Sequence, residues 1–170
     1  MDRVFVTERL ELRPVAPSDH AWLLSHWREP GVRRFLFDGK APSSAEVLES
    51  IEGSERNFAS SGYGLWIMRK AGEPLGAVGL LPFEDDASRP EMIISLVPAA
   101  WGRGYAAEAA RTVVEHALET LRLPQVMAEV DRGNDASAAL VARLGMEPGE
   151  SVPGVLGPMT RYRRSGTPDR

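Results

Sequence analysis

Two glycines and an arginine precede an alanine-rich run in the segment WGRGYAAEA, residues 101–109. The first amides of a helix have no partner within the helix, and the helix dipole is positive at that end. Glycine lets the backbone approach a ligand closely, and Arg103 adds a positive charge. Gly102 and Gly104 therefore predict an anion-binding turn whose ligand is a phosphate or pyrophosphate. A structural strand-to-helix turn, in which the glycines only supply positive φ angles, explains the same residues equally well.

Known phosphate-binding motifs narrow the choice of ligand. A Walker A loop ends in Gly-Lys followed by Ser or Thr, and no such triplet occurs in the chain. A dinucleotide-binding fingerprint tolerates Ala107 in place of its third glycine, but it opens a parallel βαβ unit. The segment here follows several short runs that are typical of antiparallel strands, so the context argues against that fingerprint.

Other reactive side chains are sparse. The chain of 170 residues has no cysteine, which excludes disulfides, thiolate zinc sites and a cysteine nucleophile. The three histidines, His20, His26 and His116, are scattered, so we expect no metal site. The formal charge of −4 and the pI of about 5.5 give no electrostatic reason to expect a nucleic-acid partner.

The elements that position the turn follow from the hydrophobic pattern. Alternating apolar and polar residues predict a half-buried strand at residues 8–15. Two helices follow. The first is capped by Ser18 or Asp19 and stops before a Pro-Gly pair, and the second is opened by the capping box of Ser43 and Glu46.

Three short strand-like runs come next, separated by turn-forming segments. Short links favour antiparallel pairing of consecutive strands. After the glycine turn, the pattern predicts a long helix, a strand, a short helix capped by Asn134 or Asp135, and a last strand. In chain order these runs are residues 63–70, 73–83, 91–98, 106–121, 125–130, 134–145 and 157–164.

This order predicts an α+β fold with a mostly antiparallel sheet flanked by helices. The long helix is a crossover, so the strands that it joins, 91–98 and 125–130, should be parallel. We expect one domain over residues 1–170, with a disordered tail at 165–170. Because no apolar run suits a membrane span or a signal peptide, we expect a soluble, cytoplasmic protein with no membrane partner.

Three segments together resemble a known family. EMIISLVPAAWGRGYAAEA resembles the coenzyme A-binding motif of the GNAT superfamily of N-acetyltransferases. TERLELRPVAPSDHAWL and VMAEVDRGNDASAALVARLGM resemble the opening strand and helix and the second conserved motif of its RimJ/RimL-like branch, the ribosomal-protein-alanine acetyltransferases. The resemblance covers roughly residues 7–147 and implies the splayed central sheet of the GNAT fold.

The resemblance implies acetyl-CoA as the cosubstrate and places it at the glycine turn. The family pattern Gln/Arg-x-x-Gly-x-Gly/Ala reads Trp101-Gly-Arg-Gly-Tyr-Ala106 here, with tryptophan in the polar first position. A bulge near Leu96 and Val97 would splay the strand, and the pantetheine arm would bond to the exposed strand backbone. The pyrophosphate would be held by the amides of the turn, those of Gly102, Arg103, Gly104, Tyr105 and Ala106.

Attack of an amine on a thioester needs a base for the amine, a donor for the oxyanion and a proton for the thiolate. The resemblance implies Glu91 as the base, at the start of the strand that leads to the turn; a solvated strand-end glutamate is the alternative. Ser137 is implied as the acid, since Val141 stands where many members have a tyrosine; packing in the first helical turn is its alternative role. Asn134 matches the family asparagine that contacts the pantetheine arm, and it also fits an N-cap.

We therefore expect an N-acetyltransferase that moves the acetyl group of acetyl-CoA directly to a primary amine, on a small molecule or a protein N-terminus. The alternatives are a coenzyme A-binding regulatory module without transferase activity and a nucleotide-binding domain. Loops at 28–45, 59–64 and 147–158 are expected to select the acceptor. A homodimer stays open, because the last strand could pair within the chain or swap with a partner.

Overall fold

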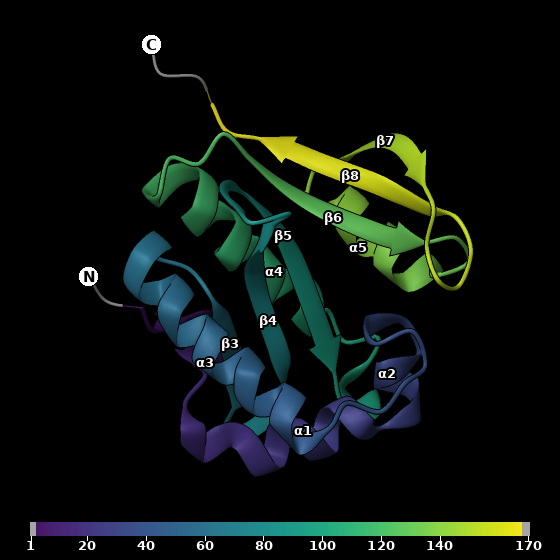
Figure 1. The fold of residues 1–170 in the computed structure, drawn as a ribbon. Helices are drawn as coiled ribbons and strands as arrows, with labels where there is room; N and C mark the ends of the chain where they lie inside the picture. Colours follow the sequence, from purple (N-terminus) through teal and green to yellow (C-terminus); the bar gives the residue numbers. More distant parts are fainter. Residues whose placement is uncertain (1–2, 168–170) are drawn as a thin grey trace.

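A single mixed sheet carries the architecture of the computed structural model, which describes residues 3–167 (Figure 1). Within these residues eight strands pair in the order β1-β2-β3-β4-β5-β6-β8-β7. All neighbours are antiparallel except β5 and β6, which are parallel, as the crossover predicts. The strands are β1 Phe5–Val6, β2 Glu11–Pro14, β3 Leu65–Lys70, β4 Glu73–Phe83, β5 Asp86–Leu96, β6 Gln125–Asp131, β7 Glu147–Val152 and β8 Met159–Ser165.

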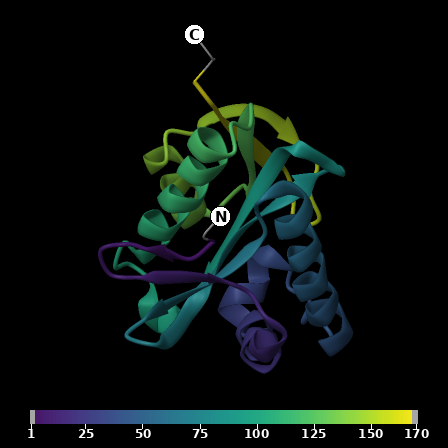
Figure 2. The same ribbon diagram turned by 90° about the vertical axis from the view of Figure 1, so that its left-hand side faces the viewer.

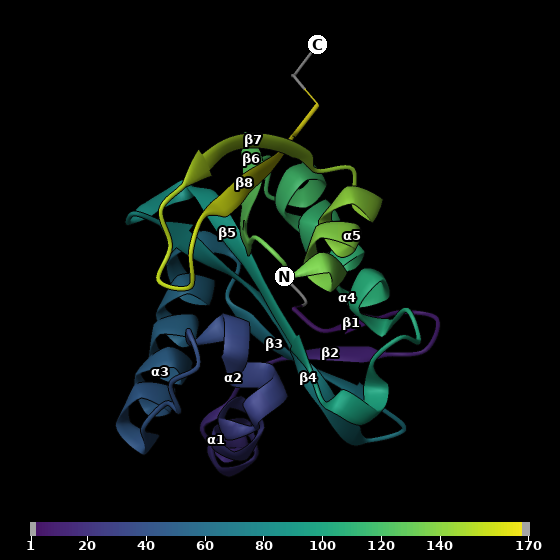
Figure 3. The same ribbon diagram turned by 90° about the vertical axis from the view of Figure 1, so that its right-hand side faces the viewer.

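Helices cover both faces of the sheet, so the predicted α+β class is confirmed (Figures 2 and 3). One face carries α1 His20–Arg28, α2 Pro30–Leu36 and α3 Ser44–Ser61. The other carries α4 Tyr105–Glu115, which continues into a wide turn at His116–Thr120, and α5 Asp135–Arg143.

Alternation along the strands divides the core in two. Met92 and Leu96 of β5 pack in the core under α4 and α5. Ile93 packs instead against the core under α1, α2 and α3. Successive strand residues point to opposite faces, so Glu91, like Ile93, faces the side of α1–α3.

Two predicted loops contain regular structure. The loop at 28–45 holds α2, whose first residue is Pro30 and whose N-cap is Glu29, with its carboxylate accepting from the Val32 amide at 3.0 Å. Proline is common at the first position of a helix and also just after the end of one. The sequence pattern indicated only that Pro30 ends the preceding helix. The loop at 147–158 holds β7, which pairs with β8.

The link between β4 and β5 is shorter than predicted. Only Glu84 and Asp85, both with positive φ, separate the strands, and β5 begins at Asp86 rather than at Glu91. The polar letters of this segment are typical of a turn, but pairing with β4 extends the strand through them.

The C-terminal part is also more ordered than predicted. Ser165 belongs to β8, and the Gly166 amide donates to the Pro124 carbonyl at 3.0 Å. The disordered tail was therefore predicted to start too early, at residue 165. Residues 168–170 lie outside the described residues. β8 pairs with β6 and β7 of the same chain. No helix between residues 3 and 167 is long and apolar enough to cross a membrane.

Candidate active site

The parallel strands β5 and β6 separate soon after they meet. Their one paired position in the described chain is Glu91 opposite Met127. From there the two strands diverge toward their C-terminal ends (Figure 1). We call residues 92–96 of β5 and 128–131 of β6 the splay. Backbone groups that face the splay have no strand partner there and are open to a ligand.

The bulge expected near Leu96 and Val97 is wrong. Pairing of β4 with β5 is regular through Gly76 opposite Leu96, and the register shifts only at Pro82 and Phe83, at the other end of the pair. The splay therefore forms while the ladder between β4 and β5 stays intact. Only the pairing with β6 is lost.

Hydrogen bonding along β5 identifies which backbone groups face the splay. The Val97 amide donates to the Leu75 carbonyl at 2.8 Å, so it is used on the β4 side. Antiparallel pairs alternate, and the amides and carbonyls of Leu96 and Ile94 therefore point away from β4, toward β6. The Leu96 carbonyl accepts from the indole Nε1 of Trp101 at 2.9 Å. This leaves the Leu96 amide and both groups of Ile94 as candidates for the pantetheine arm. Ile94 is absent from the residues predicted for this role.

The glycine turn presents a row of free donors. Gly102 and Gly104 adopt φ angles of 74° and 80°, the left-handed region that glycine tolerates. None of the amides of residues 102–107 donates to another described residue, and the first to bond back is that of Glu108, to the Gly104 carbonyl at 3.1 Å. A side chain at Gly102 would meet no atom within 4 Å, so this side of the turn is open. The turn fits the pyrophosphate of coenzyme A.

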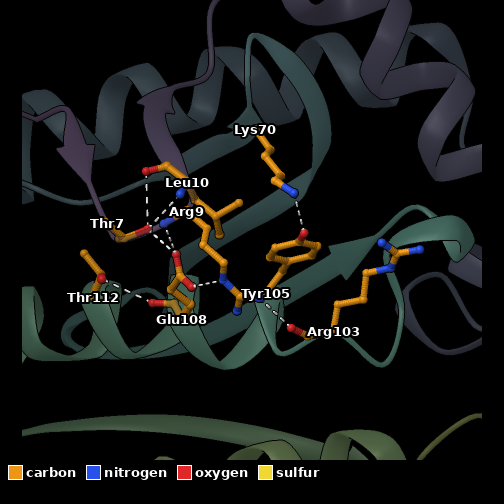
Figure 4. Close-up of polar contacts among 8 residues, drawn as sticks. All are labelled: Thr7, Arg9, Leu10, Lys70, Arg103, Tyr105, Glu108 and Thr112. Atoms are coloured by element: carbon orange, nitrogen blue, oxygen red, sulfur yellow. Dashed lines mark hydrogen bonds and ion pairs between the residues drawn. The ribbon is translucent and has the colours of Figure 1, made fainter.

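A brace from the loop between β1 and β2 holds the turn (Figure 4). The Arg9 guanidinium donates through Nη1 to the Arg103 carbonyl at 2.8 Å and through Nε to Glu108 Oε1 at 2.7 Å. Glu108 Oε2 accepts from the Arg9 amide at 2.9 Å and from the Thr7 hydroxyl at 2.5 Å. The Arg9 side chain therefore fixes both the carbonyl of Arg103 in the turn and the carboxylate of Glu108 in the first turn of α4.

Tyr105 extends this brace toward β3. Its ring lies 4.4 Å from the Arg9 guanidinium, and its hydroxyl accepts from Lys70 Nζ at 2.9 Å, which lowers the pKa of the phenol. Figure 4 shows the side chain of Arg103 directed away from this network, and that side chain is exposed. Three cations therefore surround the turn, of which the sequence pattern indicated only Arg103.

Trp101 joins the turn to α2. Its indole is half exposed, and a Cβ on Gly31 would lie 2.8 Å from its ring. Only glycine at that position of α2 leaves room for the indole. Trp101, which stands where the family pattern has a polar residue, thus brings the glycine turn into contact with α2 on the opposite face of the sheet.

Glu91 is partly buried where the strands separate. Burial, and then the negative charge of Glu129, raise the pKa of its carboxyl to about 7, while Arg161 opposes the rise. Arg161 is itself held by Glu129 at 3.3 Å and by Glu150 at 2.9 Å. A carboxyl with this pKa can both accept and release a proton near neutral pH, as a general base must.

The start of α5 flanks the splay from the other face. Asn134 caps the helix, its Oδ1 accepting from the Ser137 amide at 3.2 Å, which confirms the predicted N-cap. The amide nitrogen of Asn134 keeps its donors for a ligand. The Ser137 hydroxyl has no hydrogen-bond partner among residues 3–167, and no such bond joins it to Glu91. The two residues predicted to be catalytic therefore lie on opposite faces of the sheet.

Comparison with known proteins decides the family. Residues 9–147 match the acetyltransferase (GNAT) domain family. The chain belongs to this family. It is accordingly an acetyl-CoA-dependent acetyltransferase, which favours the predicted enzyme over a regulatory coenzyme A-binding module and over a nucleotide-binding domain.

Individual relatives agree with this assignment. FsC-acetyl coenzyme A-N(2)-transacetylase of Aspergillus fumigatus is 31% identical, over 82% of this chain and 63% of its own length. The crystal structure of an acetyltransferase from Agrobacterium tumefaciens is 28% identical, with a TM-score of 0.81 over 95% of this chain and 93% of that one. RimL, a ribosomal L7/L12 alpha-N-protein acetyltransferase in complex with coenzyme A, has a TM-score of 0.83 over 96% and 98%, and its 16% identity shows a shared fold alone.

Proposed function

We propose that the acceptor of the acetyl group is a primary amine, on a small molecule or a protein N-terminus, and that Glu91 is the general base. The observation that carries this proposal is the placement of Glu91. Its carboxyl, with a pKa raised to about 7, belongs to the one residue of β5 that pairs with β6 within residues 3–167. A base there is next to the splay, where the thioester is expected, and reaches the amine directly or through one ordered water.

The rest of the site divides into binding roles. The amides of Gly102 to Ala106 and the side chain of Arg103 hold the pyrophosphate. The Leu96 amide and Asn134 hold the pantetheine arm. Acetyl-CoA supplies an acetyl group activated as a thioester. The free amides of the turn and the unpaired edge of β5 support these assignments.

The transfer balances without a covalent enzyme intermediate. The amine nitrogen forms a bond to the acetyl carbonyl carbon, the carbon–sulfur bond breaks, and its electron pair leaves with the sulfur. The nitrogen loses one proton to Glu91. The thiolate takes one proton, for which the Ser137 hydroxyl is our candidate donor, itself reprotonated from water.

We further place the chain in the RimJ/RimL-like branch, which would make a protein N-terminus one acceptor to test. The similarity to the fold of RimL and the match of TERLELRP and NDAS to that branch support this placement. Since identity to RimL is low, the acceptor has to be found by assay.

The test is an acetyl-transfer assay with acetyl-CoA and a panel of hexylamine, hexamethylenediamine and a peptide that begins with alanine. Release of free thiol and a mass increase of one acetyl group on the amine are both measured. We expect Glu91→Gln to lower kcat at pH 7 by about a hundredfold or more, with little change in KM for acetyl-CoA. Glu147→Gln, the same change at an exposed position of β7, is the matched control and should transfer normally.

Two results would contradict the proposal. A Glu91→Gln enzyme with wild-type kcat would remove Glu91 as the base. A wild-type enzyme that acetylates no amine of the panel, while it binds coenzyme A, would remove the acceptor class.

A further inference from the structure

Asp131, the last residue of β6, has a buried carboxyl oxygen, Oδ1, to which no residue between 3 and 167 donates a hydrogen bond. Only 9% of the residue is exposed, and its Oδ1 is shielded from water without any hydrogen bond. No lysine or arginine among residues 3–167 forms an ion pair with it. A buried carboxylate oxygen without a hydrogen bond or a counter-charge costs free energy. A ligand that brings a cation to this point would offset that cost.

The carboxyl of Asp131 faces the same side as Glu91. Val130 packs in the core under α4 and α5, so its neighbour Asp131 points to the opposite face, where α1 and α2 lie. Electrostatics agree: burial and then the negative charge of Asp38, just after α2, raise the pKa of the Asp131 carboxyl. Arg161, on the same face, is already held by Glu129 and by a second glutamate.

The spacing of the two carboxyls defines a length. Asp131 is four residues beyond Met127, the partner of Glu91. At about 3.3 Å per residue these positions are about 13 Å apart along β6. A nitrogen within about 3 Å of each carboxyl leaves roughly 7 Å between the two nitrogens. An alkyl chain of five or six carbons spans that distance.

We propose that Asp131 binds a second cationic nitrogen of the acceptor, and that the substrates are therefore small diamines or polyamines. The inference rests on the proposed amine transfer, in which the reacting nitrogen lies near Glu91. An ammonium group offers three donors, and Asp131 Oδ1 is an acceptor without a donor in the part of the chain that the structure describes. Asp38, exposed at the same end, adds negative charge that draws a cation to the site.

The experiment compares two acceptors of equal length that differ in one charge, hexamethylenediamine and hexylamine. Binding to the protein saturated with coenzyme A is measured by calorimetry, and kcat/KM with acetyl-CoA is measured in parallel. In the wild type we expect the diamine to be favoured at least tenfold in both measurements. In Asp131→Asn the ratio should fall to about two, the statistical factor for two equivalent amines.

Asp85→Asn is the matched control, because it removes one carboxylate from an exposed turn at the opposite end of β5. This variant should keep the wild-type ratio. Thermal unfolding of Asp131→Asn checks the fold, and its Tm should not fall, since an unpaired buried charge has been removed.

Each outcome decides the inference. Equal binding of the two amines by the wild type overturns it, and so does a diamine preference that survives Asp131→Asn. A preference that depends on Asp131 in binding, with no acetyl transfer to either amine, would uphold the cation site and refute the proposed function instead.

Discussion

The raised pKa of Glu91 makes a prediction about stability that is independent of catalysis. In the folded protein this pKa is about 7, against an ordinary value of 4.5. The folded state thus holds the proton more tightly than the unfolded state, so stability falls as the pH rises from about 4.5 through 7. Glutamine does not ionise and escapes this loss. We expect Glu91→Gln to be more stable than the wild type at high pH. At low pH this advantage should be much smaller.

The magnitude follows from the two pKa values. Full ionisation of a carboxyl whose pKa rises from 4.5 to about 7 costs about 3 kcal/mol, and between pH 5 and pH 8 the cost grows by about 2.5 kcal/mol. In a domain of this size 1 kcal/mol moves Tm by about 2–4 °C. The advantage of Glu91→Gln should therefore be larger at pH 8 than at pH 5 by roughly 5–10 °C, measured by circular dichroism without ligand.

Two further variants sharpen this test. Glu147→Gln, at an exposed site, should show no such dependence on pH. Glu129→Gln removes a charge that raises the pKa of Glu91, so a further Glu91→Gln change in that background should gain less. The same Tm difference at pH 5 and pH 8 would show that Glu91 titrates normally. Glu91 would then lack the raised pKa that suits a general base near neutral pH.

Three other substitutions test the packing and the turn. Ser54→Ala leaves the buried Leu65 amide without its acceptor at 2.8 Å, and should cost about 1–3 kcal/mol in a urea titration while coenzyme A binding stays normal; an unchanged midpoint would count against it. Gly102→Ala forces a side chain into a φ of 74°, at a cost of about 1 kcal/mol, and should weaken coenzyme A binding severalfold by calorimetry; unchanged affinity would make the turn purely structural. Arg9→Lys loses the guanidinium fork that reaches Glu108 and the turn carbonyl together, so KM for acetyl-CoA should rise more than kcat falls; an equal loss in both would argue against a positioning role.

The elements that the sequence predicted correctly have strong local signals. The capping box of Ser43 and Glu46 opens α3 as expected, with the Glu46 amide donating to the Ser43 hydroxyl at 3.1 Å. The missed elements had ambiguous or absent signals. Pro30 suits the end of one helix and the start of another, and here it does the latter. β7 shows no apolar alternation, and its residues form a strand because β8 offers a partner.

The same distinction applies to the site. The anion turn was predictable because its glycines, its cation and its helix lie within nine residues. The brace that holds the turn could not be predicted. Arg9 and Glu108 are 99 residues apart, and nothing in the local sequence around either residue indicates the contact. Asp131 likewise stands directly after the strand predicted at 125–130, and nothing in the sequence marks it. Its hydrogen bonding depends on which side chains of α2 and β8 lie beside it, and only the tertiary structure determines that.

The two carboxyls on the face of α1 and α2 share a physical signature. Glu91 and Asp131 both have raised pKa values, and in both burial is the main cause. The glycine turn shows the opposite arrangement, with Arg9, Lys70 and Arg103 around free amides. A net charge of −4 conceals this segregation of an anion site from acidic groups across the sheet. Buried charge of one sign lowers stability, and such a cost is typical of sites shaped for a ligand. If that explanation holds, Glu91→Gln and Asp131→Asn should each raise Tm at pH 8 while they impair transfer or diamine preference. A loss of stability in either variant would mean that its carboxyl makes favourable contacts in the folded chain, and the ligand would no longer be needed to explain it.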